Sequence, residues 1–518
     1  MIRRFNACLV STAAVLCAMT ARADVRLPAI FSDHMVLQRG VAAPVWGSAD
    51  PGEEVKVTLG GADLPGAQPK SAVAGTDGRW KLKLGALKGG GVTTLTVQGK
   101  NTLTVSDVLI GEVWLCSGQS NMAMAVRGCN DFPKEQAEAQ HPQIRMFTVT
   151  SGPAASPQDD CRGSWVVCSP DTVAGFSATA YFFGREIHRS LGVPVGLVHS
   201  SVGGTPIEAW TSWDAQKDLT PLKSPIFDNW TKRQAAWDPA KAVEAYETRL
   251  AAYRDAAAKA KEAEKPAPQR PAKPVEPHLD SHYPATLYNG KINPLVPYAI
   301  RGALWYQGEN NASPTGGPLY HLQLTTLIRD WRRRWSAEFP FGFVQLPDFH
   351  APQKEPVENT GWTLVREGML QTLSTPRTGM AVTLGLGEAN NIHPKNKQEV
   401  GLRLAMWALA DVYGKKGIAS SGPLPVGHEV SGSAIVVRFK HADGGLQAPG
   451  GSLRGFAIAA ADKRWMRADA RIDGDRVVVS SPDVPNPVAV RYAWADTPDC
   501  NLKNAAGLPA SPFRTDDW

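Results

Sequence analysis

Short runs of alternating apolar and polar residues open the chain and predict β-strands. From residue 24 to about 105, runs such as 55–59 are separated by clusters of Gly, Pro and Asp. This spacing of strand and turn signals is typical of a small β-sandwich. Runs of the same kind return near the end of the chain, at 433–439, 455–460 and 477–481. We therefore expect an N-terminal β-sandwich domain over 24–105 and a C-terminal β-domain over 426–518.

The middle of the chain has a different pattern, in which uninterrupted apolar strands alternate with amphipathic helices. Strand-like stretches occur at 108–116, 195–199 and 301–306, and a helical stretch occurs at 322–335. Strands that are apolar on both faces belong to a parallel sheet covered by helices on both sides. The pattern therefore predicts an α/β catalytic domain over 106–425.

One segment, 213–282, interrupts this alternation. Residues 239–265 are rich in Ala, Glu, Lys and Arg and predict a helix, whereas the Pro-rich stretch 265–271 cannot continue one. We interpret 213–282 as an insertion in the catalytic domain. Its charges are those of a solvated helix face.

The first 23 residues have the features of a signal peptide. Arg3 and Arg4 precede an apolar run over 7–19, and Ala21-Arg22-Ala23 is a cleavage pattern of small residues. We therefore expect a mature chain beginning at Asp24 and an exported protein, periplasmic or extracellular. The run is too short for a permanent span, and no later stretch reaches about 20 apolar residues. The sequence thus predicts no transmembrane helix.

Charge, cysteine content and the absence of metal-binding motifs limit the partners and cofactors that the sequence predicts. Without Arg3, Arg4 and Arg22 the net charge of +6 falls to about +3, which does not favour nucleic acid as a partner. Five of the seven cysteines follow the signal peptide, and Cys161 with Cys168, or Cys116 with Cys129, are candidate disulfides that spacing alone does not decide. The chain has no H-E-x-x-H and no paired C-x-x-C motif, so we expect no metal and no organic cofactor.

A serine at the end of a predicted strand indicates acyl-transfer chemistry. Such chemistry needs a nucleophile at an exposed turn, a base, and hydrogen-bond donors for the oxyanion. Ser120 follows the apolar strand 113–116 in Ser117-Gly118-Gln119-Ser120-Asn121-Met122, at a turn that places it on the carboxyl edge of the sheet. A helix starting there would direct its first N–H groups at the oxyanion. Because Met122 replaces the second glycine, the G-x-S-x-G elbow of α/β-hydrolases is not present.

Two further loops and a histidine complete the candidate site. Gly203 and Gly204 follow the strand 195–198, and adjacent glycines let a backbone N–H approach a ligand closely. The loop 307–311 follows the strand 303–306 and supplies side-chain amides. His393 lies in a polar loop before a predicted helix over 398–409, where an imidazole can act as a general base.

Together these segments resemble the sialate O-acetylesterase family of the SGNH hydrolase superfamily. The likeness rests on 117–122, 203–205, 307–311 and 392–397, and it extends to 27–38, 366–367, 489–494 and 512–516. The resemblance implies a catalytic domain of flavodoxin-like, three-layer α/β/α architecture. It also implies a serine esterase that removes acetyl groups from a carbohydrate, without a cofactor.

The same resemblance assigns roles to individual residues. It makes Ser120 the nucleophile, His393 its base, and the Ser120 N–H, Gly204 and Asn311 the oxyanion donors. Candidate substrate contacts are Gln119, Gln307, Glu309, Arg366 and Glu367. Arg366 and Glu367 have an alternative interpretation, in which they pair with each other.

One position departs from the family pattern and leaves the third member of the triad open. The family usually has an aspartate two residues before the histidine, where this chain has Asn391. Asn391 and Glu388 are equal candidates for holding the imidazole, and a Ser–His dyad is the default.

The substrate and the function itself each have alternatives. Acetylated sialic acid and an acetylated plant or bacterial polysaccharide, such as xylan or xyloglucan, fit an exported enzyme equally well. The alternatives to an esterase are a non-catalytic carbohydrate-binding protein on the same fold and a peptidase that uses Ser120.

Overall fold

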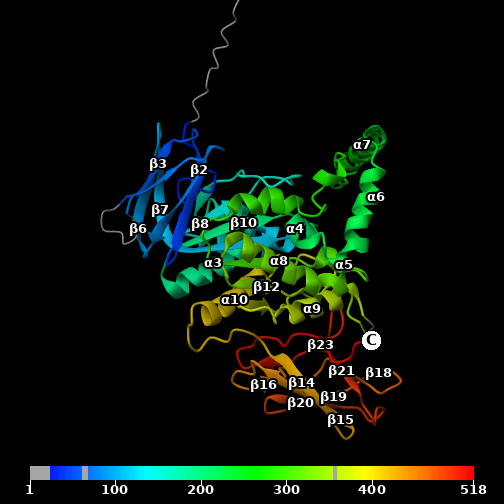
Figure 1. Cartoon of the computed structure of the whole chain (residues 1–518). Helices are drawn as coiled ribbons and strands as arrows, with labels where there is room; N and C mark the ends of the chain where they lie inside the picture. Colours follow the sequence, from blue (N-terminus) through cyan, green and yellow to red (C-terminus); the bar gives the residue numbers. More distant parts are fainter. Residues whose placement is uncertain (1–23, 61–67, 354–358) are drawn as a thin grey trace, which may run out of the picture.

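The structure is a computed structural model, and it describes residues 24–60, 68–353 and 359–518. The predicted signal peptide lies outside the described residues. The β-rich N-terminal part lies at one end of the molecule and the β-rich C-terminal part along another side, with the α/β part between them (Figure 1). No helix within the described ranges is both long and apolar enough to cross a membrane.

A seven-stranded, mostly parallel sheet forms the centre of the α/β part. Its order is β13-β12-β11-β7-β10-β8-β9, and only the edge strand β9 is antiparallel to its neighbour. Its strands are β7 Thr102–Gly118, β8 His141–Thr148, β9 Trp165–Cys168, β10 Val195–Ser201, β11 Gly302–Tyr306, β12 Phe341–Val344 and β13 Thr378–Ala381. This arrangement confirms the prediction of a central, mainly parallel sheet.

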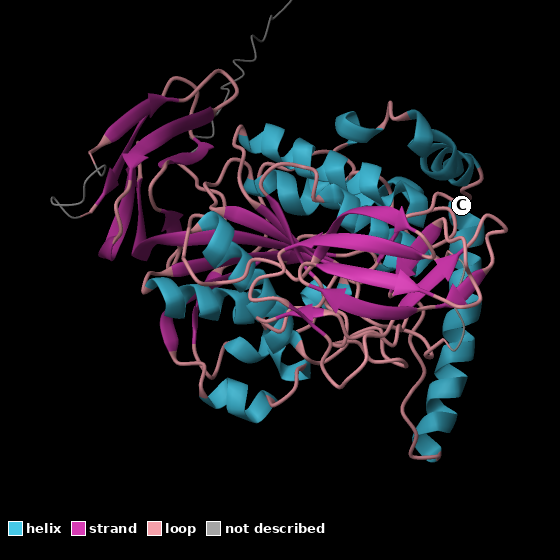
Figure 2. Cartoon of the chain, turned by 90° about the horizontal axis from the view of Figure 1, so that it is seen from below, coloured by secondary structure: helices cyan, strands magenta, loops and turns pink. Residues whose placement is uncertain are grey.

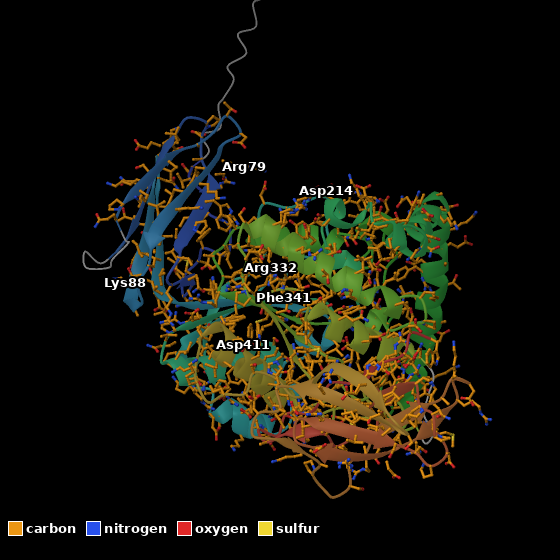
Figure 3. All side chains as sticks on the ribbon, turned by 60° about the horizontal axis from the view of Figure 1, so that its bottom comes forward. Arg79, Lys88, Asp214, Arg332, Phe341 and Asp411 are labelled. Carbon is orange, nitrogen blue, oxygen red and sulfur yellow. The ribbon has the colours of Figure 1, made fainter. Side chains whose placement is uncertain are left out.

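Helices cover both faces of this sheet (Figure 2), because successive strand side chains enter two different cores. Trp114 packs into a core with α3 and α10, whereas its neighbour Leu115 belongs to the core on the other face, with α8 and α9. Figure 3 places Phe341 of β12 in the middle of the molecule. The helices are α1 Ser120–Ala123, α2 Phe132–Ala137, α3 Ala178–Leu191, α4 Trp213–Gln216, α5 Thr220–Leu222, α6 Asn229–Ala235, α7 Pro239–Glu262, α8 Tyr320–Trp335, α9 Gly361–Thr372 and α10 Lys397–Trp407.

The N-terminal β-domain is joined to the central sheet by one continuous strand. The first half of β7 pairs with β6 and the second half with β10 and β11. The boundary that we predicted at 105–106 therefore falls inside a strand. The other strands of this part are β1 Val36–Gln38, β2 Ala42–Ser48, β3 Glu54–Leu59, β4 Lys70–Val73, β5 Arg79–Ala86 and β6 Gly90–Gln98.

The C-terminal β-domain contains two four-stranded sheets, β14-β15-β20-β19 and β18-β17-β21-β23, and the pair β16-β22. It begins with β14 at Leu424, two residues before the predicted boundary. Its strands are β14 Leu424–Ser431, β15 Ala434–Lys440, β16 Leu446–Gln447, β17 Phe456–Ala459, β18 Trp465–Arg467, β19 Asp469–Asp473, β20 Arg476–Ser480, β21 Ala489–Tyr492, β22 Lys503–Asn504 and β23 Phe513–Arg514.

The segment 213–282 forms the short helices α4 to α6 and the long helix α7, followed by an extended stretch without helix or strand over 265–276. Helices α5, α6 and α7 lie at the end of the molecule opposite the N-terminal part (Figure 1). The insertion therefore leaves the order of the sheet strands undisturbed.

Candidate active site

Ser120 begins α1 directly after the end of the central strand β7. Gly118 makes this turn, with a φ of 141°, and a Cβ there would lie 2.1 Å from the carbonyl oxygen of Tyr306. Only glycine fits so close to the next strand. The N–H of Gln119 then donates to the same carbonyl at 2.9 Å. The turn thus fixes Ser120 at the carboxyl edge of the sheet, as predicted.

The glycine loop lies directly against Ser120. A Cβ built on Gly203 would lie 3.5 Å from the Cβ of Ser120, and Gly204 has a φ of 72°. Within the described part of the chain, no acceptor binds the N–H of Gly203 or of Gly204. These N–H groups can therefore donate to an oxyanion formed at Ser120.

The asparagine loop reaches the same place through Asn310. Gln119 Oε1 accepts from the N–H groups of Gly308 at 3.5 Å and Asn310 at 3.3 Å. Asn310 Nδ2 donates to the carbonyl of Gly204 at 2.7 Å, and the residue is exposed. Our sequence argument offered the amides of this loop but did not single out Asn310.

Asn311 is oriented away from this exposed edge. Its Oδ1 accepts from the N–H of Ile207 at 3.0 Å and from Gln307 Nε2 at 2.7 Å. Its Nδ2 consequently faces Glu208, to which it donates at 3.1 Å, and Gln323, at 3.5 Å. The amide that we expected to serve as an oxyanion donor already has acceptors in this structure.

Gln119 and Gln307 are too deeply buried to contact a substrate, which corrects our expectation for both. Their side chains are 3% and 0% exposed. Gln307 donates to the carbonyl of Thr205 at 3.1 Å as well as to Asn311, and Gln119 holds the asparagine loop as described above. Both residues join the loops to one another instead.

The histidine loop is tied to the nucleophile helix through Asn121. Asn121 Nδ2 donates to the carbonyl of Ile392 at 2.9 Å, so the residue after Ser120 contacts the residue before His393. Lys397 Nζ donates to Asn121 Oδ1 at 2.8 Å and to the carbonyl of Pro394 at 2.5 Å. Two segments 271 residues apart therefore meet at the candidate nucleophile and base.

The ionisable groups of Lys397 and Glu309 are buried, and both bond to the side chain of Asn121. Lys397 is 0% exposed, and burial lowers its pKa to about 8. Glu309 Oε1 accepts from Asn121 Nδ2 at 2.5 Å, and burial raises the pKa of its carboxyl. Glu309 Oε2 is also buried and has no hydrogen-bond partner within the described residues. We expected Glu309 to contact substrate, but the structure gives it a place under Asn121.

The imidazole of His393 is half-buried, and its surroundings favour the neutral form. Burial is the main cause that lowers its pKa below the usual 6.5, and the positive charge of Lys397 lowers it further. Within the described residues, no hydrogen bond to the ring is formed. A neutral imidazole at neutral pH is able to accept a proton from a serine hydroxyl.

Asn391 and Glu388 hold the backbone of the histidine loop and do not reach its ring. Asn391 Oδ1 accepts from the N–H of His393 at 3.0 Å, and its Nδ2 donates to the His393 carbonyl at 3.0 Å. Glu388 Oε2 accepts from the same amide at 2.9 Å, and Oε1 accepts from the N–H of Lys395 at 2.9 Å. In this geometry neither candidate for the third triad member contacts the imidazole.

Comparison with known proteins identifies the family. The model of the carbohydrate esterase family of sialic acid-specific acetylesterases matches residues 110–244 and 281–410. The sialate O-acetylesterase of Rattus norvegicus is 30% identical over 94% of this chain and 94% of its own length, and that of Homo sapiens is 27% identical over 94% and 92%. The chain belongs to the sialate O-acetylesterase family. It is therefore a carbohydrate O-acetylesterase, a carboxylic ester hydrolase, which confirms the resemblance drawn from the motifs.

A solved structure supports the same assignment. A carbohydrate acetylesterase from Xanthomonas citri superimposes with a TM-score of 0.79 and 35% identity, over 95% of this chain and 100% of that one. The family model leaves out residues 245–280, which lie inside the insertion that we predicted at 213–282. The family model does cover 213–244, so only this inner part of the segment lies outside its two matched ranges.

Arg366 and Glu367 connect the catalytic part to the C-terminal domain, which corrects our expectation of substrate contacts. Arg366 is 0% exposed, and its guanidinium donates to the carbonyls of Leu346, Pro347, Ala495 and Asp496. Glu367 pairs with Arg514 at 2.7 Å instead of with Arg366. Both side chains are thus occupied by interdomain contacts.

His282 lies near the glycine loop, and the sequence analysis did not identify it. Its Nδ1 lies 3.0 Å from Asp280 Oδ1. This hydrogen bond is the main cause that raises the pKa of His282, and the nearby Gly204 carbonyl raises it further. Glu208 lies within its electrostatic reach, although burial raises the pKa of that carboxyl. The only signal in the sequence was the position of His282 at the end of the insertion.

The described residues contain neither a disulfide nor a cluster of metal-ligating side chains. Cys116, Cys129, Cys161, Cys168 and Cys500 are all free thiols, so neither disulfide that we considered is formed. Cys161 and Cys168 belong to different hydrophobic cores, which explains why their short spacing does not bring them together. Within the described residues, no group of three or more His, Cys, Asp or Glu side chains could hold a metal ion.

Proposed function

We propose that this carbohydrate O-acetylesterase cleaves O-acetyl esters of a carbohydrate through an acetyl-serine intermediate on Ser120. The observation that carries the proposal is the convergence of three loops on Ser120. Gly203 lies against its Cβ, Asn310 reaches Gly204, and Asn121 ties its helix to the residue before His393. The order of the parallel strands and these loops at their carboxyl ends support an SGNH-type, three-layer catalytic domain.

The first half-reaction transfers the acetyl group to the enzyme. His393 takes the proton from Ser120 Oγ as Oγ attacks the acetyl carbonyl carbon. The N–H groups of Ser120 and Gly204 and the amide of Asn310 donate to the resulting oxyanion. The intermediate then expels the sugar oxygen, which takes the proton from His393, and leaves acetyl-Ser120.

The second half-reaction regenerates the enzyme with water. His393 takes a proton from a water molecule as its oxygen attacks the acetyl carbonyl, and the Ser120 oxygen then leaves with that proton. The products are acetate and free Ser120. Because Asn391 and Glu388 contact each other and the backbone of the loop but not the imidazole, a Ser120–His393 dyad is the form that we propose.

Acetate release by a serine variant tests the proposal. Replacing Ser120 by Ala should lower the rate of acetate release from an acetylated sugar by about 10⁴-fold or more. The exposed Ser156→Ala variant is the matched control and should retain the wild-type rate. A Ser120→Ala enzyme with unchanged activity would refute the proposal. Mass spectrometry of the quenched reaction should show an acetyl group, about 42 Da, on wild type only.

We also propose that the protein is exported. The support is the charged, apolar and small-residue pattern over 1–23. N-terminal sequencing of the protein isolated from its native cells should begin at Asp24. A cytosolic protein that retains residues 1–23 would contradict this proposal.

A further inference from the structure

The two ends of the insertion lie side by side and expose an aromatic surface. Trp213 at the start of α4 stacks on Tyr283, with 6.0 Å between ring centroids and 5° between ring planes. Trp213 is 40% exposed, although a large apolar side chain is usually covered. Asp214, the next residue on α4, lies at the surface of the molecule (Figure 3). We call this pair, Trp213 and Tyr283, the aromatic platform.

Neighbouring aromatic rings pack against both members of the platform. The ring of Phe227 meets Trp213 edge to face at 5.2 Å, and that of Trp230 meets Tyr283 at the same distance. Arg233 covers the other side of Trp230, with its guanidinium carbon 3.9 Å from the ring centroid. Phe227, Trp230 and Tyr283 belong to a hydrophobic cluster that also includes Leu322 of α8. The orientation of Trp213 is therefore fixed before any ligand arrives.

The platform adjoins the candidate active site through His282. Tyr283 follows His282 directly. His282 bonds to Asp280 at 3.0 Å, and the nearby Gly204 backbone contributes to raising its pKa. The N–H of Ala285 donates to the carbonyl of Glu208 at 3.0 Å and anchors this segment to the element after the glycine loop. A sugar whose acetyl group is at Ser120 would thus have the platform beside it.

The charges around the platform favour a neutral sugar. Asp280 pairs with His282 at 3.0 Å and faces Arg233 at 3.8 Å, so each of these two cations already has a carboxylate partner. The carboxylate of a sialic acid requires an unpaired cation, as in other anion sites. An uncharged sugar ring instead requires an apolar surface with a few polar groups for its hydroxyls, which Trp213 and His282 supply.

We propose that the aromatic platform and His282 form a carbohydrate subsite that binds a neutral sugar ring adjacent to the acetylated residue. This inference rests on the proposed function, because it places the scissile ester at Ser120. It makes the substrate class a neutral, acetylated oligosaccharide or polysaccharide. Trp213 stacks on the ring, and the His282–Asp280 pair binds a hydroxyl group.

Three esters distinguish the subsite from the catalytic chemistry. We would measure kcat and KM with 4-nitrophenyl acetate, an acetylated xylo-oligosaccharide and an O-acetylated sialic acid. Replacing Trp213 by Ala should lower kcat/KM for the oligosaccharide about tenfold, mainly through KM, and leave 4-nitrophenyl acetate unchanged. Trp213→Phe should restore most of the loss. Tyr253→Ala on α7 is the control from the same insertion. It should leave kcat/KM unchanged for both the oligosaccharide and 4-nitrophenyl acetate.

The outcomes separate the subsite from the function on which it rests. An unchanged kcat/KM of Trp213→Ala for the oligosaccharide, or an equal fall on 4-nitrophenyl acetate, would overturn the subsite. A wild-type enzyme that hydrolyses the sialic acid ester and leaves the oligosaccharide untouched would overturn the neutral-sugar class. By contrast, 4-nitrophenyl acetate hydrolysis that survives in Ser120→Ala would refute the proposed function and the subsite with it.

Discussion

Lys397 Nζ donates to Asn121 Oδ1 at 2.8 Å, and this bond joins the helix of the candidate nucleophile to the start of α10, which follows the loop of the candidate base. The same ammonium donates to the carbonyl of Pro394, the residue after His393. A buried lysine costs free energy unless its hydrogen bonds are satisfied. Lys397 is therefore a positioning residue in our interpretation.

Replacing Lys397 by Met should lower kcat by about 10- to 100-fold and change KM little. The variant leaves Asn121 Oδ1 and the Pro394 carbonyl without a donor, so Ser120 and His393 lose their relative position. Thermal unfolding should show a loss of about 1–3 kcal/mol. Lys395→Met, at an exposed neighbour, is the control for both measurements. Wild-type kcat in a folded Lys397→Met enzyme would contradict the positioning role.

The pH profile should report the lowered pKa of His393. Only the neutral imidazole accepts the serine proton, so kcat/KM should rise with pH through the folded pKa and then level off. Burial and Lys397 place that midpoint below 6.5. In Lys397→Met one of these two causes is absent, so the midpoint should move upward. An acid limb centred above 6.5 in wild type would contradict this assignment of the base.

Sequence patterns predicted the parts of the site that depend on local chain geometry. Ser120 was placed correctly because a strand, a glycine and a helix start follow one another within a few residues. The predicted boundary at 105–106 falls inside β7, which passes from an alternating to a fully buried pattern without a break. A change of periodicity marks a change of environment and not always the end of a strand.

Side-chain orientation and long-range partners could not be read from the sequence. Asn310 and Asn311 are adjacent residues of the same type. Asn311 is turned away from the exposed edge by buried partners, which are Ile207, Gln307 and Glu208. Arg366 was expected to contact substrate or to pair with Glu367, but it donates to carbonyls about 130 residues away in sequence. Such partners are brought together by the fold alone.

Reducing agents should leave the stability of this protein unchanged. All five cysteines after residue 24 are free, and burial raises the pKa of Cys129 to about 11 and that of Cys168 to about 12. Thermal unfolding with and without dithiothreitol should give the same Tm. Thiol titration after unfolding in guanidinium should count five groups in the chain from Asp24. A lower Tm on reduction would indicate a disulfide that this structure lacks.

Arg366→Ala should destabilise the joint between the catalytic part and the C-terminal domain. The substitution removes a fully buried guanidinium that satisfies four carbonyls and lies 3.8 Å from Asp348 Oδ1. Loss of a buried charged partner costs on the order of 3–5 kcal/mol. Glu367→Gln, which weakens a partly exposed pair with Arg514, should cost less than about 1 kcal/mol. Calorimetry of both variants would test this order, and equal losses would contradict it.

The final prediction concerns Asn391, which stands where the family usually has an aspartate. Its side chain is hydrogen-bonded to Glu388. Asn391 donates to Glu388 Oε2 at 2.9 Å, and the pKa of Glu388 is lowered mainly by the Lys395 N–H and then by Asn391, so Glu388 is a carboxylate at neutral pH. Asn391→Asp would place two carboxylates in contact. Their repulsion should disturb the histidine loop and lower kcat about tenfold. Adding Glu388→Gln restores a donor to the new aspartate.

A double-mutant cycle of these two changes should therefore show a favourable interaction of about 1 kcal/mol or more. Glu388→Gln alone should lower kcat less than about threefold, because the amide oxygen of the substituted side chain still accepts from the Lys395 N–H. A triad acid would behave differently, since its amide variant typically loses about 10⁴-fold in kcat. Such a loss in Glu388→Gln would show that Glu388 approaches the imidazole during turnover and that the dyad is incomplete.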